Sequence, residues 1–252
     1  MAAHGLYVYG ITRSGHPLPG RQPGVGGPGA PVRLLPTGRL TAVVSDAPAG
    51  LRARRRDLTA HQDLLLALAK AGPVLPMRFG MVAPDEASVL RQLAAEERTH
   101  LAALELLDGQ LEMNLKAFPV DHSLAALIRE DPQIRRLREQ ARRQPGYEAD
   151  LRLGEAVAAG LTRRAAEAAA RILDELRAVA GTWTRGPEVT GCVLNASFLV
   201  PRSETGRFHD VVHRGTAALR DRVELRVTGP LPCYSFVDCD PRPQPRPVPA
   251  GA

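Results

Sequence analysis

The strongest hint of metal chemistry in the chain is a pair of histidines, His209 and His213, which are four residues apart. On a helix this spacing places both side chains on one side, as in a zinc-binding pair. The zinc-protease pattern needs a glutamate directly after the first histidine, but Asp210 stands there. No third ligand follows nearby. The pattern therefore favours solvated or helix-capping histidines over a metal site.

The cysteines offer little for redox or zinc chemistry. Only Cys192, Cys233 and Cys239 occur, and no C-x-x-C spacing is formed. Three cysteines are too few for a disulfide framework, so their number fits a reducing cytoplasm. We expect them to be small buried apolar residues rather than zinc ligands or a redox pair.

Two segments could bind phosphate. Residues 24–29 match G-x-G-x-x-G, but Pro28 and its neighbouring prolines prevent the helix that a dinucleotide site needs, so the segment predicts a flexible loop. Arg52 and the run of arginines at 54–56 precede a predicted helix. They could contact phosphates, but a solvated helix entry is the favoured interpretation because few aromatic residues lie nearby.

No signature of an enzyme is visible. G-x-S-x-G, P-loop and kinase motifs do not occur, and no carboxylates are paired in an apolar setting. We therefore expect no catalytic residue, no cofactor and no metal, although an enzyme with an unrecognised site stays an alternative. The composition, with 44% hydrophobic and 24% charged residues, is that of a globular protein.

The chain is basic, with a formal net charge of +6. Basic proteins often bind nucleic acid or anionic membranes. Here Lys70 and Lys116 are the only lysines, and the abundance of Arg, Ala, Gly and Pro suggests GC-rich codons as the source of the charge. An Arg-rich nucleic-acid-binding protein is the alternative. No apolar run is long enough to span a bilayer and no signal peptide is apparent, so we expect a soluble cytoplasmic protein.

The pattern of apolar residues predicts alternating strands and helices. In the first part of the chain we expect strands at 6–11, 32–35 and 40–45, a helix at 57–71 capped by Asp57, and a helix from Pro84 to about Leu107. Between the helices, residues 74–80 predict an extended edge or bulged strand because Pro76 interrupts them.

The second part begins with the clearest strand, 111–116, in which apolar and polar residues alternate. Short polar helices at 121–145 and a long helix at about 151–180 follow, the latter with an apolar stripe from Leu153 to Val179. We expect this stripe to pack within the chain rather than in a coiled coil. The remaining predicted elements are strands at 192–200, 223–227 and 233–237 and a helix at 207–219.

This order predicts an α+β fold of two domains: 1–107 is an N-terminal α+β domain and 108–240 a modified ferredoxin-like domain. Prolines alternate from Pro241 to Pro249, so residues 241–252 predict a disordered, extended tail.

Several segments together resemble the gas vesicle protein GvpL/GvpF family. The most specific are V-L-P-M-R-F-G at 74–80 and G-P-L-P-C-Y-S-F-V at 229–237. Further similar segments are L-Y-V-Y-G-I at 6–11, L-T-A-V-V-S at 40–45, His61, G-Q-L-E-M-N-L-K at 109–116 and N-A-S-F-L-V at 195–200. They occur in the family's order and cover about residues 5–238.

The resemblance implies a non-enzymatic protein of gas vesicle formation, located in the cytoplasm at the gas vesicle. Its implied partners are the hydrophobic shell protein and other gas vesicle accessory proteins, with neither nucleic acid nor a lipid membrane. Such a protein could pair with a strand of the shell protein through an exposed sheet edge. We expect the Pro76 segment or residues 234–237 to form this edge, and the candidate contact residues are Arg78, Phe79, Gly80, Tyr234 and Phe236.

Overall fold

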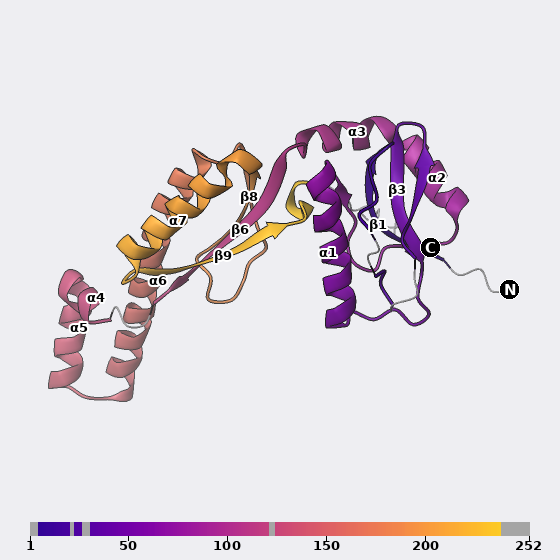
Figure 1. Cartoon of the computed structure of the whole chain (residues 1–252). Helices are drawn as coiled ribbons and strands as arrows, with labels where there is room; N and C mark the ends of the chain where they lie inside the picture. Colours follow the sequence, from indigo (N-terminus) through magenta and orange to yellow (C-terminus); the bar gives the residue numbers. More distant parts are fainter. Residues whose placement is uncertain (1–4, 21–22, 27–30, 121–123, 238–252) are drawn as a thin grey trace, which may run out of the picture. The chain divides into compact units, whose positions relative to one another are not determined.

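The structure is a computed structural model that describes residues 5–20, 23–26, 31–120 and 124–237. The chain divides into two compact units (Figure 1). Unit 1 comprises residues 1–105 and 236–252, and unit 2 comprises residues 106–235. The tail predicted at 241–252 lies outside the described residues. None of the described helices combines the length and the hydropathy that a membrane span requires.

Unit 1 is built on an antiparallel sheet with the strand order β2-β3-β1-β4, in which β5 also pairs with β1. The strands are β1 (Leu6–Arg13), β2 (Arg33–Thr37), β3 (Leu40–Asp46), β4 (Leu75–Pro76) and β5 (Val82–Ala83). The first three strands confirm the predictions for 6–11, 32–35 and 40–45. In β1 every residue from Leu6 to Thr12 is buried, so both faces of this central strand are covered.

The helices of unit 1 are α1 (Arg55–Ala71), α2 (Glu86–Ala95) and α3 (Glu97–Leu106). The prediction that Asp57 caps the first helix was wrong, because α1 begins two residues before Asp57. This residue lies buried in the first turn of α1. The predicted single helix from Pro84 is divided at Glu96. Asp85 caps α2, because its Oδ1 accepts a hydrogen bond of 2.7 Å from the backbone N–H of Ser88.

Unit 2 contains a second antiparallel sheet with the strand order β7-β8-β6-β9. Its elements in chain order are β6 (Gln110–Pro119), α4 (Leu124–Glu130), α5 (Pro132–Arg143), α6 (Tyr147–Arg177), β7 (Thr182–Arg185), β8 (Leu194–Pro201), α7 (Thr205–Leu219) and β9 (Val223–Leu231). The predicted strands 111–116, 192–200 and 223–227 are therefore confirmed, each with shifted ends.

Unit 2 departs from the sequence analysis at three places. Strand β7 was not predicted, because its four residues, T-W-T-R, show no alternation of buried and exposed positions. Residues 233–237, which read as a last strand, instead hold a turn of 3₁₀ helix from Tyr234 to Phe236. The long helix also starts and ends before its predicted bounds of 151–180.

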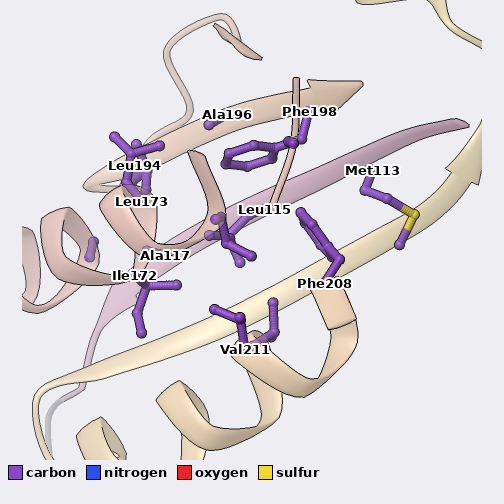
Figure 2. Packing of buried hydrophobic residues seen from close by; sticks show 14 of the residues in the cluster. Met113, Leu115, Ala117, Ile172, Leu173, Leu194, Ala196, Phe198, Phe208 and Val211 are labelled. Carbon is purple, nitrogen blue, oxygen red and sulfur yellow. The ribbon is translucent and has the colours of Figure 1, made fainter. Parts of the chain in front are cut away.

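The core of unit 2 lies between its sheet and helices α6 and α7 (Figure 2). Phe198 of β8 and Phe208 of α7 meet edge to face, with ring centroids 5.4 Å apart. From Ala165 to Leu176 the apolar stripe of α6 is buried in this core, so the prediction that it packs within the chain is confirmed there. The first half of α6 lies beside α4 and α5 (Figure 1).

Candidate partner-binding site

The predicted contact residues Arg78, Phe79 and Gly80 form a tight turn. The N–H of Met81 donates to the carbonyl oxygen of Arg78 over 3.2 Å, and Gly80 has a φ of +92°. A positive φ at the third position of such a turn favours glycine. The predicted extended segment 74–80 is thus a strand only at Leu75–Pro76, at the sheet edge. Arg78 is exposed in the turn rather than aligned along a strand.

A buried polar network holds this turn against the sheet. The hydroxyl of Tyr7 lies 2.9 Å from Nδ1 of His61, and the N–H of Gly80 donates to that hydroxyl over 3.2 Å. Nε2 of His61 lies 2.9 Å from the carbonyl oxygen of Met77. Because a carbonyl only accepts, Nε2 carries the proton and Nδ1 accepts from Tyr7. The two side chains therefore clasp both ends of residues 77–80.

Aromatic rings surround this network. Phe79, which is half-buried, meets Tyr7 and His61 edge to face, with centroids 6.0 and 5.8 Å apart. The ring of Tyr9 stacks on His61 at 5.6 Å. Burial lowers the pKa of His61, partly opposed by its hydrogen bond to Met77. His61 therefore stays neutral at pH 7 and supports the packing.

Val25 and Gly26 of the glycine-rich segment are anchored by the same cluster, whereas residues 27–29 of the predicted flexible loop lie outside the described residues. Val25 is fully buried, and its N–H donates to the hydroxyl of Tyr9 over 2.7 Å. The N–H of Gly26 donates to Oδ1 of Asp57 over 3.1 Å. Burial raises the pKa of Tyr9. These contacts use backbone N–H groups for structure, so this part of the segment does not present them to a phosphate.

Next to the turn lies an apolar groove of about 510 Å³, lined entirely by unit 1. Its floor is formed by strand residues and by the buried face of α2. Met77 and Met81, which flank the turn, line it together with Phe236 and Val237. The lining residues that reach the solvent include Val82, whose exposed fraction is 44%. The further apolar residues of the floor are Val8, Ile11, Leu75, Val89 and Leu93.

Polar side chains of α2, of α3 and of the residue between them also line the groove. They are Ser88, Gln92, Glu96, Thr99 and His100. Nε2 of His100 lies 3.4 Å from a carboxylate oxygen of Glu96. Burial lowers the pKa of His100, and the charge of Glu96 partly opposes this shift. The groove thus combines an apolar floor with polar positions that can hydrogen-bond to a peptide.

The remaining candidate residues separate at the end of β9. Phe236 lines the groove of unit 1, whereas Tyr234 belongs to unit 2. Between them, Ser235 is held by Glu112 of β6, whose carboxylate accepts from the Ser235 N–H over 2.9 Å and from its hydroxyl over 2.6 Å. Glu112 is 3% exposed. The two hydrogen bonds from Ser235 to Glu112 stabilise the 3₁₀ turn that follows β9.

The other chemically suggestive residues are not gathered in one place. His209 and His213 are both exposed on α7, and no group of three potential metal ligands occurs among the described residues. Cys233 is buried, and burial together with the charge of Glu112 raises its pKa to about 12. Of the arginine run, Arg56 pairs with Asp57 at 3.6 Å.

His61 has a structural role in unit 1. It is 2% exposed, and both of its ring nitrogens have hydrogen-bond partners that hold residues 77–80 against the sheet. Sequence reasoning selected Phe236 and the turn but missed the groove. The polar residues of the groove come from α2, α3 and Glu96, a stretch that the sequence pattern predicted to be one helix.

Comparisons with known proteins support the family resemblance that the sequence motifs indicated. The family model described as "Gas vesicle synthesis protein GvpL/GvpF" matches residues 5–238. The chain is 44% identical to gas vesicle protein F of Streptomyces sp. (strain CB03234), over 92% of this chain and 99% of that protein. It is 33% identical to gas vesicle protein L of the same strain, over 91% of each chain.

The fold is also similar to a solved structure. The crystal structure of GvpF from Anabaena sp. PCC7120 matches with a TM-score of 0.74 and 24% identity, over 92% of this chain and 97% of that one. This likeness supports the mixed helix and sheet architecture. With the family model spanning nearly all described residues, the chain belongs to the gas vesicle GvpL/GvpF family.

Proposed function

We propose that this chain is an accessory protein of gas vesicle assembly that binds the hydrophobic shell protein in the cytoplasm at the gas vesicle. The observation that carries the proposal is the family match over residues 5–238. The partner, by the resemblance, is a small apolar protein. A binding role, rather than catalysis, is supported by the groove of unit 1 and by the burial of His61.

The groove and the adjacent sheet edge suit an apolar strand as the ligand. Among the described residues, this side of β1 is paired with β4 and β5, of two residues each, and with the backbone of Met77 and Met81, whose hydrogen bonds to Tyr9 and Val8 measure 2.8 and 3.0 Å. An extended segment could add to this short edge through backbone hydrogen bonds and place alternate side chains in the groove. Shielding an apolar strand in this way would prevent aggregation of the shell protein before it assembles.

Two candidate edges were expected from the sequence, and of these the Pro76 segment has the position that strand addition requires. It lies at the end of the sheet, next to groove residues Leu75 and Met77. Residues Tyr234–Phe236 form a 3₁₀ turn and offer no strand edge. Phe236 contributes to the proposal instead as a wall of the groove.

The experiment that tests the function is co-purification. The tagged chain is expressed with the shell protein and, separately, with an unrelated small apolar protein that forms inclusion bodies. We expect the shell protein alone to be retained on the resin. Recovery of neither protein, or of both to the same extent, would contradict specific binding.

We also propose that the chain has the two domains expected from the sequence, an N-terminal α+β domain at 1–107 and a modified ferredoxin-like domain at 108–240, with the difference that Phe236 and Val237 belong to unit 1. The support is the order β6, α4–α6, β7, β8, α7, β9 together with the sheet order β7-β8-β6-β9. Limited proteolysis tests the boundary. A stable fragment that begins near residue 108 is expected, whereas cleavage inside α6 as the first event would contradict it.

A further inference from the structure

Helix α5 of unit 2 presents an exposed row of positive charge. It contains five arginines and one glutamate, an excess of four positive charges. All five arginines are exposed. Within the described parts of the chain, none of them forms an ion pair with a carboxylate. Helices α5 and α6 form an antiparallel helical hairpin (Figure 1). Arginines that stabilised this hairpin through ion pairs would have carboxylate partners, so the row is available to a partner protein.

A hollow lies beside two of these arginines. It has a volume of about 310 Å³, and its lining residues come from the end of α5 and the start of α6. These two helices lie side by side in Figure 1. Gln140 and Gln144 line it from α5. Arg136 lies four residues before Gln140, and Arg143 lies three residues after it. Residues at these spacings are neighbours on a helix surface, so the two arginines flank the hollow.

From α6 the hollow is lined by Tyr147, which is 85% exposed, together with Glu148, Ala149 and Arg152. Leu151, one turn further along α6 and 47% exposed, lies beyond the lining residues. The nearby carboxylate of Glu148 is already paired with Arg152 at 2.5 Å. Tyrosine and arginine are the residues most enriched at the centres of protein interfaces. The combination indicates a docking surface rather than an ordinary solvated face.

We propose that this hairpin surface, defined as Arg136, Gln140, Arg143, Gln144, Tyr147 and Leu151, binds a partner protein through an acidic segment that carries an apolar side chain. The carboxylates complement the arginines, and the apolar side chain enters the hollow against Tyr147. The glutamine amides can both donate to and accept from a peptide backbone.

The same features disfavour nucleic acid. Tyr147 is the only aromatic residue of α4, α5 and α6. Binding of single-stranded nucleic acid relies on several aromatic platforms along a basic groove, and one ring does not provide them. This inference does not depend on the groove of unit 1 or on the shell protein.

Fluorescence anisotropy with two synthetic peptides tests the proposal. One peptide consists of glutamates around a central phenylalanine, and the other is the same peptide with serine in the centre. We expect the phenylalanine peptide to bind more tightly, with an affinity that falls as salt is added. The double variant Arg136→Glu, Arg143→Glu should weaken both peptides by about tenfold or more. Tyr147→Ala should weaken only the phenylalanine peptide.

The matched control is Arg171→Glu, Arg214→Glu, which changes the net charge equally at exposed arginines of α6 and α7 outside the hairpin surface. It should leave the affinity for both peptides unchanged, and a thermal melt of each variant verifies its folding. Equal losses in both double variants would overturn the proposal, as would absence of binding at low salt. Tighter binding of a single-stranded oligonucleotide than of either peptide would also overturn it.

Discussion

Tyr7 and His61 are joined by a hydrogen bond of 2.9 Å between the Tyr7 hydroxyl and Nδ1, deep in the core of unit 1. Since Nε2 donates to the carbonyl oxygen of Met77, His61 holds its proton there and is neutral. This pair connects the first strand to the V-L-P-M-R-F-G segment. It therefore positions the turn and one wall of the groove.

The neutral state of His61 makes stability depend on pH. Burial places its folded-state pKa below the ordinary value of 6.5. As pH falls below 6.5, the unfolded chain binds a proton that the folded chain does not, so the free energy of unfolding falls. We expect denaturant midpoints to decrease as the pH is lowered from 7.5 through this range. His61→Gln should flatten that decrease. His100→Gln should flatten it separately, because burial lowers the pKa of that residue too. A slope unchanged in both variants would contradict this account.

Tyr7→Phe isolates the hydrogen bonds from the ring packing. The substitution leaves Nδ1 of His61 and the N–H of Gly80 without the Tyr7 hydroxyl, and we expect a loss of about 1–3 kcal/mol in the free energy of unfolding. Tyr147→Phe is the control, because its side chain is 85% exposed, and its effect should stay within about 0.5 kcal/mol. Chemical denaturation measures both. Equal effects in the two variants would refute the role of the buried pair.

Gly80→Ala tests the conformation of the turn. Gly80 has a φ of +92°, and a Cβ added there would have no atom beyond those of its chain neighbours within 4 Å, so strain rather than a clash opposes the new methyl group. A side chain in the left-handed region costs about 1–2 kcal/mol. Gly154→Ala, at an exposed position inside α6, should instead stabilise the chain by about 0.5–1 kcal/mol. Melting temperatures that move in the same direction for both variants would argue against this turn.

The thiol of Cys233 should resist labelling. Its pKa is raised to about 12, so at pH 8 only about one molecule in ten thousand carries the reactive thiolate. In a Cys239→Ser background, we expect a thiol reagent to modify Cys192, which is partly exposed, and to reach Cys233 only after denaturant is added. Rapid modification of two thiols in the native protein would show that residue 233 is accessible.

Much of the sheet architecture could be predicted because local patterns determine it. Alternation in 111–116 and the aromatic and β-branched run at 6–11 identified β6 and β1. Strand β7 could not be predicted in this way, since Trp183 and its neighbours are only partly buried and the strand depends on pairing with β8. Residues 233–237 have strand-like composition, but the hydrogen bonds of Ser235 to Glu112 bend them into a 3₁₀ turn.

The candidate site was predictable only in part. The family resemblance selected Phe79, Gly80 and Phe236, and the structure places the first two in the turn beside the groove that Phe236 lines. Val25 hydrogen-bonds to Tyr9, 16 residues away, and His61 hydrogen-bonds to Tyr7, 54 residues away. No local sequence pattern predicts contacts over such separations. The groove itself depends on the packing of α2 and α3.

The most direct test of the proposed function is the affinity of the shell protein for Val82→Asp compared with Leu58→Asp. Both side chains belong to unit 1 and are exposed to similar extents, 44% and 42%, but only Val82 lines the groove. With melting curves confirming that both variants fold, we expect Val82→Asp to lose at least about tenfold in affinity, because a carboxylate in the groove must be desolvated when an apolar segment binds. Leu58→Asp should bind like the wild type. Equal binding by the two variants would contradict the claim that the groove holds the shell protein.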